Sequence, residues 1–530
     1  MADIVLTTLN ARHLHTAFGL RYLLANLGPL QTNASLVEFD LHQRPLDIVE
    51  TLLAQRPKIV GLGVYIWSVT PATEVVATLK RLCPNLMVVL GGPEVSFEAE
   101  SQPIVQLADY VIAGEGDLAF AELCGQLLSG QRPDGKIIAA KPPEFSGLAL
   151  PYGLYDDHDV EHRVIYVEAS RGCPFSCEFC LSSLDIPVRA APLPRLFDHL
   201  QRLLDRGARQ FKFVDRTFNL NLDHSRAILE FLLTHYRPGH FFHFELIPDR
   251  LPESLREVIA RFPPGVLQFE IGVQTFNAEV ASRIQRRQDY QRLEHNLRFL
   301  RDQTAVHLHA DLIAGLPGES LESFAAGFDR LIGLRPHEIQ VGILKRLRGA
   351  AIARHDAEWE MVYNPQPPYD ILQNRLIDFA AMQKLRRFAR YWDLVGNSGN
   401  FCETLPLIWS NTAQASRLSG TLADPGGGGI PVPLSPFASF LRWSEWLHAR
   451  ARRTDGIALA RLAEFLFHYL TTDRKLDTAQ TAAALWRDYQ RGGRRDPPPF
   501  LKPFLPPDAA KPTPSRASNG APRRQARHWG

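Results

Sequence analysis

Short apolar runs alternate with amphipathic stretches along the first 130 residues of the chain. The runs are each about as long as a strand and cover Ile4–Leu9, Leu36–Leu41, Ile59–Tyr65, Leu86–Leu90 and Tyr110–Ala113. The intervening stretches have helical spacing over Leu14–Leu27, Leu46–Gln55, Pro71–Leu82 and Leu118–Leu128. Runs that are apolar at nearly every position indicate parallel strands covered on both faces. We therefore expect a doubly wound, flavodoxin-like α/β domain over residues 1–135.

A second series of the same kind begins after residues 136–160, a stretch rich in Pro, Gly and Asp that is predicted to be a linker. Its strands are Val164–Glu168, Phe211–Val214, Phe241–Leu246, Leu267–Val273, Val306–Ile313 and Glu338–Leu344. Helical segments separate them over Pro194–Arg206, Ser225–Tyr236, Glu253–Arg261, Tyr290–Asp302 and Glu319–Gly333. Such spacing fits consecutive right-handed βαβ units. Six units are too few for a closed eight-stranded barrel, so we expect a partial (β/α)6 barrel over residues 161–346.

The regular alternation stops near residue 347. Helical patterns cover Tyr369–Tyr391, Ser435–Ala449, Ile457–Leu470 and Thr478–Tyr489, so residues 347–490 are predicted to form a mainly helical third domain. Residues 491–530 contain nine prolines and few aliphatic residues, and we expect this tail to be disordered. Its nine Lys and Arg against two Asp and Glu give it a charge of +7 in a chain whose net charge is +2. A solvated extension is favoured over a nucleic-acid contact.

The hydropathy pattern also bears on location. No apolar run approaches the roughly 18 residues that a membrane-spanning helix needs, and the N-terminus lacks the charged and apolar regions of a signal peptide. We therefore expect a cytoplasmic protein. In a reducing cytoplasm, clustered cysteines bind metal or carry out redox chemistry more often than they form disulfides.

Three of the six cysteines lie within eight residues, at Cys173, Cys177 and Cys180. This C-x-x-x-C-x-x-C loop follows the first strand of the second series, at the end where barrel-type sheets place their active sites. Three thiolates can each bind one iron of a [4Fe–4S] cluster and leave the fourth iron open to a cofactor or substrate. The alternative is a zinc loop, which needs a fourth ligand. No further cysteine and no histidine lies in the loop.

The loop and the strand ends around it resemble the radical SAM superfamily. In that family the open iron chelates the amino and carboxylate groups of S-adenosylmethionine (SAM), and an electron from the cluster cleaves the sulfonium to give a 5′-deoxyadenosyl radical. The matching segments are Asp215-Arg-Thr-Phe-Asn219, Glu270-Ile-Gly-Val-Gln-Thr275 and Asp311-Leu-Ile-Ala-Gly-Leu-Pro-Gly-Glu319. The resemblance assigns SAM-binding roles to Phe179, Asp215, Glu270, Gln274 and Gly315. A place in the core is the alternative for Phe179, and a helix start is the alternative for Glu319.

The N-terminal domain resembles the cobalamin-binding domains that precede many radical SAM cores. The residues that carry this resemblance follow the third, fourth and fifth strands, at Ser68, Gly91, Gly92, Gly114, Glu115 and Gly116. In the family they line the channel for the nucleotide tail of the cofactor. The alternative is a flavodoxin-like domain that has lost its ligand.

One loop departs from the cobalamin pattern. Proteins that ligate cobalt from below use D-x-H-x-x-G, whereas the loop here runs Asn10-Ala-Arg-His13-Leu-His15-Thr-Ala-Phe-Gly19. Three alternatives follow: cobalt has no histidine ligand from the protein, His15 serves out of pattern, or cobalamin does not bind. An exposed or capping role is favoured for His13 and His15.

The C-terminal domain resembles an uncharacterised domain that follows some cobalamin-type radical SAM cores. The resemblance rests on Asn364-Pro365, Pro368-Tyr369 and Asn397-Ser-Gly-Asn-Phe401. These residues receive no chemical role from the sequence.

Together the resemblances imply an enzyme that cleaves SAM reductively with a [4Fe–4S] cluster. Cobalamin as a second cofactor implies methyl transfer to an unactivated carbon or phosphorus of a substrate that the sequence does not name. A low-potential electron donor such as flavodoxin or ferredoxin is the implied partner. We do not expect the protein to bind a membrane or nucleic acid. One alternative is a non-catalytic iron–sulfur protein that binds cobalamin and SAM. A radical methylthiotransferase is disfavoured, because such enzymes carry three cluster cysteines in the N-terminal domain, where this chain has only Cys83 and Cys124.

Overall fold

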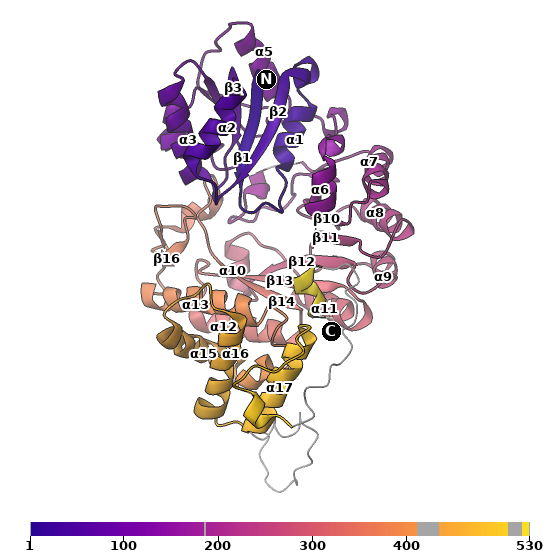
Figure 1. The fold of residues 1–530 in the computed structure, drawn as a ribbon, viewed down its shortest axis with the longest axis vertical. Coiled ribbons are helices and arrows are strands. Elements are labelled where there is room, and N and C mark those ends of the chain that lie inside the picture. Colours follow the sequence, from indigo (N-terminus) through magenta and orange to yellow (C-terminus); the bar gives the residue numbers. More distant parts are fainter. Residues whose placement is uncertain (1, 185–186, 411–433, 507–521, 529–530) are drawn as a thin grey trace.

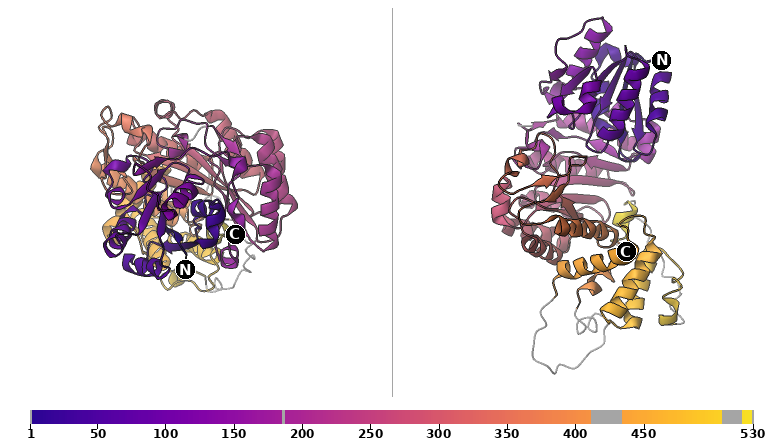
Figure 2. Two further views of the ribbon diagram at one scale, coloured as in Figure 1. Left: turned by 90° about the horizontal axis from the view of Figure 1, so that it is seen from above. Right: turned by 90° about the vertical axis from the view of Figure 1, so that its left-hand side faces the viewer.

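The computed structural model describes residues 2–184, 187–410, 434–506 and 522–528 of the chain. Three tiers follow one another along the long axis in the order of the sequence (Figures 1 and 2). The N-terminal sheet forms one end, a second sheet lies in the middle, and the C-terminal helices form the other end.

The first tier is a six-stranded parallel sheet with helices on both faces, in the strand order β2-β1-β3-β4-β5-β6. Its strands are β1 (Ile4–Asn10), β2 (Ala34–Asp40), β3 (Ile59–Gly63), β4 (Met87–Gly91), β5 (Tyr110–Ala113) and β6 (Ile137–Ala139). Its helices are α1 (Phe18–Ala25), α2 (Pro45–Ala54), α3 (Val69–Leu82), α4 (Pro103–Leu107) and α5 (Ala119–Leu128), with short turns η1 (Gly28–Asn33) and η2 (Ala99–Ser101). Separate apolar cores lie on the two faces. The first five strands have the flavodoxin-like order that was predicted.

The sequence prediction missed the sixth strand. Ile137–Ala139 lies within the stretch predicted to be a linker, yet it pairs in parallel with β5. This edge strand is only three residues long and mostly exposed, so it lacks the apolar run that marks a buried strand. The rest of the stretch contains η3 (Phe145–Gly147), η4 (Pro151–Leu154) and α6 (Asp157–His162). Phe145, Tyr152 and Tyr155 are buried there and belong to the core of the second tier.

The second tier is a sheet of six parallel strands in the order β14-β13-β12-β11-β10-β7. The strands are β7 (Ile165–Val167), β10 (Gln210–Phe213), β11 (Phe241–Leu246), β12 (Leu267–Gln274), β13 (His307–Ala314) and β14 (Glu338–Ile343). The helices are α7 (Leu193–Asp205), α8 (Leu222–Thr234), α9 (Glu253–Ala260), α10 (Ala278–Arg283), α11 (Tyr290–Gln303) and α12 (Leu321–Gly333). Among the described residues β7 and β14 do not pair, so the sheet is an open partial barrel, as predicted. β8 (Ser170–Arg171) and β9 (Arg189–Ala190) pair antiparallel at the two ends of the segment that contains the cysteine loop and η5 (Leu181–Leu184).

The third tier is mainly helical. It contains α13 (Phe379–Val395), α15 (Pro436–Ala451), α16 (Leu459–His468) and α17 (Thr478–Arg491), the hairpin β15 (Val362–Tyr363) and β16 (Ile371–Gln373), and the turns η6 (Ala351–His355), η7 (Leu405–Ile408) and η8 (Tyr469–Asp473). The first helix begins at Phe379 rather than at Tyr369, because the Asp378 side chain caps it by accepting from the Ala381 amide. The third tier packs on the second through aromatic contacts such as that of Phe328 with Trp392.

The prediction of a disordered tail does not hold for the described parts of the tail. Residues 491–506 include η9 (Lys502–Phe504) and the buried Leu501. Residues 522–528 include α18 (Arg523–Ala526), where Arg524 forms ion pairs with Glu338 and Asp393. Polar side chains make these α18 contacts, so a composition poor in aliphatic residues did not reveal them. Residues 507–521 and 529–530 lie outside the described residues.

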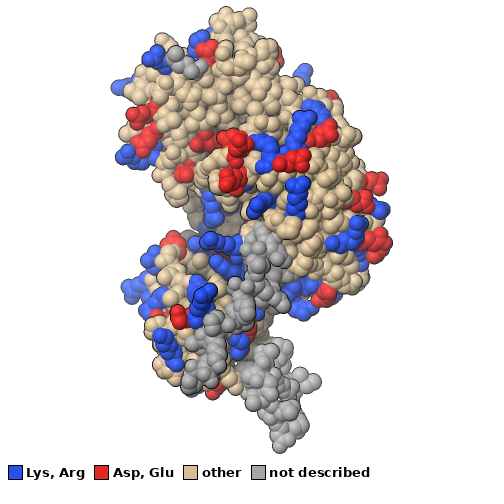
Figure 3. All heavy atoms as spheres, turned by 45° about the vertical axis from the view of Figure 1, so that its right-hand side comes forward, with Lys and Arg blue, Asp and Glu red and all other residues tan. Residues whose placement is uncertain are grey.

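Buried charges join the first tier to the second. Arg21 of α1 lies 3.0 Å from Glu38 of β2 and 2.5 Å from Asp159 of α6. Arg163 lies 2.6 Å from Glu38 and 2.9 Å from Asp159. Burial opposes ionisation of Glu38, but the hydrogen bonds from Arg163 and Arg21 together hold its pKa at about 2. On the face shown in Figure 3, acidic and basic side chains alternate along the junction of these tiers.

No described helix combines the length and the apolar character that crossing a membrane requires.

Candidate active site

The three cysteines lie on the loop that follows β7 and β8. Cys173 and Cys177 are buried, and Cys180 is half-buried. The Cys180 amide donates a hydrogen bond to the Cys177 carbonyl at 3.1 Å. Arg286 Nη1 lies 3.7 Å from the Cys177 sulfur. Burial raises the pKa of the Cys173 thiol, so an iron bound there must displace its proton.

Glu178 fixes this loop to the segment that follows the barrel. Its buried carboxylate is 2.7 Å from His355 Nε2 and also forms an ion pair with Arg354. Its amide donates to the Ile284 carbonyl, and its carbonyl accepts from the Ile352 amide at 2.9 Å. The sequence alone did not predict this role of Glu178. A charged residue between two predicted cluster ligands was the only signal for it.

All three cysteines line one cavity of about 160 Å³ at the carboxyl ends of the central strands. The structure brings Phe179, Glu270 and Gln274 to the same cavity.

The Glu270 carboxylate stays ionised in this cavity. Burial works against ionisation, but a hydrogen bond from His243 and the charge of Lys212 hold the pKa of Glu270 well below its usual range. Its carboxylate lies 3.1 Å from His243 Nε2 and 3.3 Å from Lys212 Nζ. An ionised acceptor is thus available in the cavity that the three cysteines line, as a site for a cationic or amino-bearing ligand requires.

Asp215, which follows β10, lies outside this cavity, unlike Phe179 and the two candidates on β12, Glu270 and Gln274. Its buried carboxylate accepts hydrogen bonds from the Ala169 amide at 3.0 Å and from the Ser170 hydroxyl at 2.6 Å. Burial raises its pKa to about 6. Asp215 therefore stabilises the backbone that leads into the cysteine loop. The next residues, Arg216 and Thr217, line the cavity instead.

Gly315 also lies outside the cavity. It has a φ of +93°, and a Cβ at this position would meet Ile371 Cγ2 at 2.7 Å. The glycine therefore allows β16 of the third tier to pack closely against the end of β13. This packing explains a glycine here without any contact to a cofactor.

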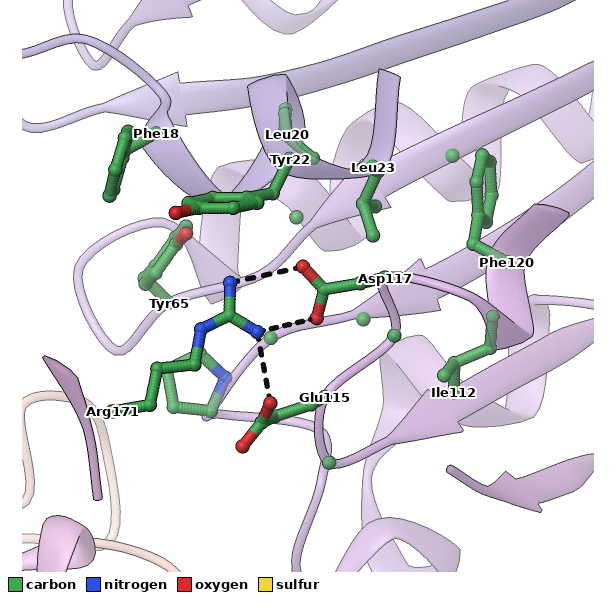
Figure 4. A pocket seen from close by; sticks show the side chains of 18 of the residues that line it. Phe18, Leu20, Tyr22, Leu23, Tyr65, Ile112, Glu115, Asp117, Phe120 and Arg171 are labelled. Atoms are coloured by element: carbon green, nitrogen blue, oxygen red, sulfur yellow. Dashed lines mark hydrogen bonds and ion pairs between the residues drawn. The ribbon is translucent and has the colours of Figure 1, made fainter. Parts of the chain in front are cut away.

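A larger cavity of about 470 Å³ lies between the carboxyl edge of the first sheet and the start of the cysteine loop. Figure 4 shows its two kinds of wall. The apolar wall comes from α1, β5 and α5 and includes Leu20, Leu23, Ile112 and Phe120. The polar wall is formed by Glu115, Asp117 and Arg171. The backbone of Gly61 and Gly63 in β3 also lines the space.

Five of the six residues predicted to bind cobalamin line this larger cavity, namely Gly91, Gly92, Gly114, Glu115 and Gly116. At Gly91 a Cβ would find its nearest neighbour, a carbonyl oxygen, 3.8 Å away, so this strand end is open toward the cavity. Gly92 has a φ of +103°, and a Cβ there would meet the Val64 carbonyl oxygen at 2.6 Å. The glycine edge and the apolar wall fit a large, flat cofactor whose tail lies against backbone.

Ser68, the sixth candidate, does not line the cavity. It is fully buried, and its hydroxyl accepts from the Tyr65 amide at 3.1 Å and donates to the Tyr65 carbonyl at 3.3 Å. Ser68 therefore stabilises the turn that brings Tyr65 to the cavity wall. The sequence did not predict a place for Tyr65 in the cavity wall.

Neither His13 nor His15 lines the larger cavity. His15 Nδ1 forms a hydrogen bond with the Tyr166 hydroxyl at 2.7 Å, and the His15 carbonyl accepts from Arg163. His15 thus has a structural role at the junction of the tiers. Within the part of the chain that the structure describes, no histidine lines this cavity, so the geometry does not support His15 as a cobalt ligand.

Arg171 links the larger cavity to the cysteine loop. Its guanidinium lies 2.9 Å from Glu115 and 2.8 Å from Asp117 in the first tier, and 3.0 Å from Glu168 at the end of β7. It is two residues before Cys173. The two cavities also share a wall, because Ser182 and Arg216 line both of them.

Two family descriptions match the tiers that form these cavities. "Radical SAM superfamily" matches residues 167–331, and "B12 binding domain" matches residues 4–124. The chain contains a radical SAM domain behind a B12-binding domain. The radical SAM domain implies a [4Fe–4S] cluster and SAM as cofactors, and the B12-binding domain implies cobalamin. A third description, "Protein of unknown function (DUF4080)", matches residues 357–424 of the third tier, of which 411–424 lie outside the described residues.

Curated proteins similar to this chain include methyltransferases. Over 199 residues the chain is 31% identical to the uncharacterized methyltransferase PH0819 of Pyrococcus horikoshii, which covers 33% of this chain and 43% of that protein. Over 332 residues it is 24% identical to the cobalamin-dependent radical SAM methyltransferase TokK of Streptomyces tokunonensis, which covers 54% of this chain and 47% of that protein. The chain therefore spans under half the length of these relatives.

Solved structures share the fold. The radical SAM methyltransferase TsrM from Kitasatospora setae, with tryptophan substrate and a SAM analogue bound, has a TM-score of 0.56 at 17% identity, over 72% of this chain and 81% of that chain. The cobalamin-dependent SAM radical enzyme OxsB, with aqua-cobalamin and SAM bound, has a TM-score of 0.57 at 11% identity, over 92% and 78%. At these identities the likeness shows a common fold.

Replacing Arg171 with methionine is expected to lower the free energy of unfolding by roughly 3–5 kcal/mol, because it leaves Asp117 and Glu168 without their cation and Glu115 with Arg189 alone. Chemical denaturation followed by circular dichroism measures this change. Arg44→Met is the matched control, since Arg44 pairs with Asp47 on the surface and should cost less than about 1 kcal/mol. Equal stability of the two variants would show that Arg171 does not hold the tiers together.

Proposed function

We propose that this chain is an enzyme that cleaves SAM reductively and transfers a methyl group by way of cobalamin. The observation that carries the proposal is the shared wall, since Ser182 and Arg216 line both the cysteine cavity and the larger cavity. Ligands in the two cavities would be neighbours, so one substrate would be within reach of both.

The residues of the chain divide the work between the two cavities. Cys173, Cys177 and Cys180 would hold three irons of a cluster, with Phe179 and the ionised Glu270 lining the remaining space. When bound, the cluster supplies an electron and an open coordination site for SAM, and cobalamin carries the methyl group. In the family that this chain resembles, the cluster binds the amino and carboxylate groups of SAM. Glu270 and Gln274 are therefore the protein groups proposed to orient the rest of the SAM molecule.

The larger cavity would hold the second cofactor without a histidine ligand. Its apolar wall of Leu20, Leu23 and Phe120 excludes water from one side. Glu115 is fixed by Arg171 at 2.9 Å and also pairs with Arg189. The polar wall is therefore preorganised rather than free to collapse into the space.

The names of the relatives support methyl transfer as the reaction type, because PH0819 and TokK are both described as methyltransferases. We propose an acceptor with an unactivated carbon or phosphorus. A low-potential donor such as flavodoxin or ferredoxin would supply electrons. Three predictions from the sequence are kept as part of this proposal. They are the cytoplasmic location, the domain boundaries at residues 135, 160, 346 and 490, and the residue assignments at both cavities.

Methylthiotransfer, the alternative reaction, finds no support in the described residues of the first tier. It would need a second cluster there, but Cys124 is fully buried in α5 and Cys83 ends α3. Burial raises the pKa of the Cys124 thiol to about 12. Such a thiol is an inert part of the core rather than a metal ligand.

Anaerobic turnover with SAM and a chemical reductant tests the proposal. We expect the reconstituted protein to form 5′-deoxyadenosine, and to form S-adenosylhomocysteine only when cobalamin is bound. An intact cluster with neither product would favour the non-catalytic alternative. 5′-Deoxyadenosine without any cobalamin-dependent product would retain SAM cleavage and remove methyl transfer.

A further inference from the structure

Three side chains from distant parts of the chain meet at the opposite end of the barrel from the cysteine loop. His307 is the first residue of β13, Glu338 is the first residue of β14, and His528 follows α18 in the tail. Each offers one ligand atom, and these atoms lie within 4.8 Å of one another. Because β13 has eight residues, this group lies about 20 Å from the carboxyl ends of the strands. The proposed function does not use it.

His307 and Glu338 are enclosed by protein. Their side chains are 0% and 3% exposed, and His307 Nε2 lies 3.0 Å from Glu338 Oε1. Burying a carboxylate is costly unless cations or donors compensate it. Arg524 Nη2 compensates the other oxygen, Glu338 Oε2, at 2.8 Å. Oε1 is therefore directed at the histidines rather than at the guanidinium.

The third side chain, His528, is oriented in the way that metal-bound imidazoles usually are. His528 Nε2 lies 3.1 Å from the Asn397 carbonyl oxygen, so an Nε2–H donates there and Nδ1 keeps its lone pair. A metal-ligating histidine almost always gives its other N–H to a carbonyl or carboxylate in this way. Arg524 in turn is held by Asp393 at 2.7 Å, which offsets its positive charge beside the group.

The Asn397-Ser-Gly-Asn segment, to which the sequence assigned no role, forms the surface on which residues 522–528 pack. The Asn397 side chain exchanges two hydrogen bonds of 2.9 Å with the backbone of Ile339 in β14. Its carbonyl accepts from Arg524 Nε at 3.0 Å. At Gly399 a Cβ would meet Arg527 Cβ at 2.7 Å, so glycine lets the tail approach. These contacts bring His528 to His307 and Glu338.

A second group of possible ligands lacks these properties. Asp156, His158 and Asp159 also lie close together. However, Asp156 caps α6, and both oxygens of Asp159 are taken by Arg21 and Arg163. This group therefore serves as a control rather than as a site.

We propose that His307, Glu338 and His528 bind a zinc ion, with water as the fourth ligand, and that the ion fastens the C-terminal segment across the amino ends of β13 and β14. Two imidazoles and one carboxylate form a donor set that zinc prefers, and they leave a fourth tetrahedral position for water. The site is separate from the cluster and from the cobalamin cavity.

Metal analysis of the full-length holoprotein tests this proposal. After anaerobic equilibration with micromolar Zn²⁺ and gel filtration, mass spectrometry should find about one zinc per chain in the wild type. His307→Gln and His528→Gln should each lower bound zinc at least tenfold, whereas His158→Gln should not change it. Iron and cobalt measured in the same samples should stay constant, which separates this site from the proposed function.

A truncated chain and a proteolysis assay guard against effects of misfolding. Removing residues 522–530 deletes one ligand and none of the barrel, so zinc should be lost while iron content is retained. In the wild type, zinc should slow trypsin cleavage at Arg523, Arg524 and Arg527 about tenfold. A wild type without zinc, or a truncated chain that keeps it, would overturn the proposal.

Discussion

Cys177→Ala is expected to abolish the cluster and to reduce SAM cleavage by more than about 100-fold. Changes to residues that merely support a metal ligand cost about 10–100-fold, so the loss of a ligand should exceed that range. Cys177 is buried, lines the cavity with the other two cysteines and receives the Arg286 contact. Iron content, the absorbance of the cluster and the rate of 5′-deoxyadenosine formation measure the effect.

Cys83→Ala is the matched control for this prediction. Cys83 lies at the end of α3 in the first tier, away from the cysteine loop, so its removal should leave iron content and SAM cleavage unchanged. If Cys177→Ala kept four irons and full activity, Cys177 would not be a ligand. If Cys83→Ala lost its iron as well, the effect would not be specific to the loop.

Gly91→Leu is expected to lower cobalamin binding about tenfold, because a leucine side chain at this strand end projects into the larger cavity. Overpacking of a fitted space typically costs 1–3 kcal/mol, and each 1.4 kcal/mol is a factor of ten in affinity. The backbone tolerates the change, since the nearest neighbour of a Cβ is 3.8 Å away. Cobalt content of the purified protein and titration with hydroxocobalamin measure the effect.

Gly125→Leu gives the comparison for this variant. Gly125 lies in α5, where a Cβ would meet nothing within 4 Å, and it does not line the cavity. Both variants should retain the cluster, and Gly125→Leu should bind cobalamin normally. Normal affinity in Gly91→Leu would mean that cobalamin binds elsewhere or not at all.

The sequence predicted most of the two sheets, for a physical reason. Their strands are buried on both faces, and continuous apolar runs as short as Ile59–Gly63 are typical of such strands. The short edge strand Ile137–Ala139 is largely exposed and has no such run. The helix that begins at Phe379 was placed too early, because its start depends on the Asp378 cap rather than on the apolar pattern.

The candidate site was predictable where backbone dictates residue type. Glycines at strand ends and the cysteine spacing are local signals, and five of the six cobalamin candidates and all three cysteines line the cavities. Asp215 and Gly315 have the expected residue types but face packing contacts instead. Arg171 depends on partners more than 50 residues away, so no local pattern predicts its contacts.

The same limit applies to the tail. His528 and Arg524 come from a proline-rich segment whose composition predicts disorder. Their partners, Glu338 and Asn397, are more than 120 residues distant in the chain. Only the folded arrangement shows that these polar residues meet.

Electron paramagnetic resonance of the protein loaded with both cofactors tests whether the two cavities form one reaction chamber. Because Ser182 and Arg216 line both cavities, the reduced cluster and Co(II) cobalamin should lie close enough for their unpaired spins to couple. We expect a spectrum that is split or broadened relative to the sum of the spectra recorded with each cofactor alone. A spectrum equal to that sum, with both cofactors bound at full occupancy, would contradict it.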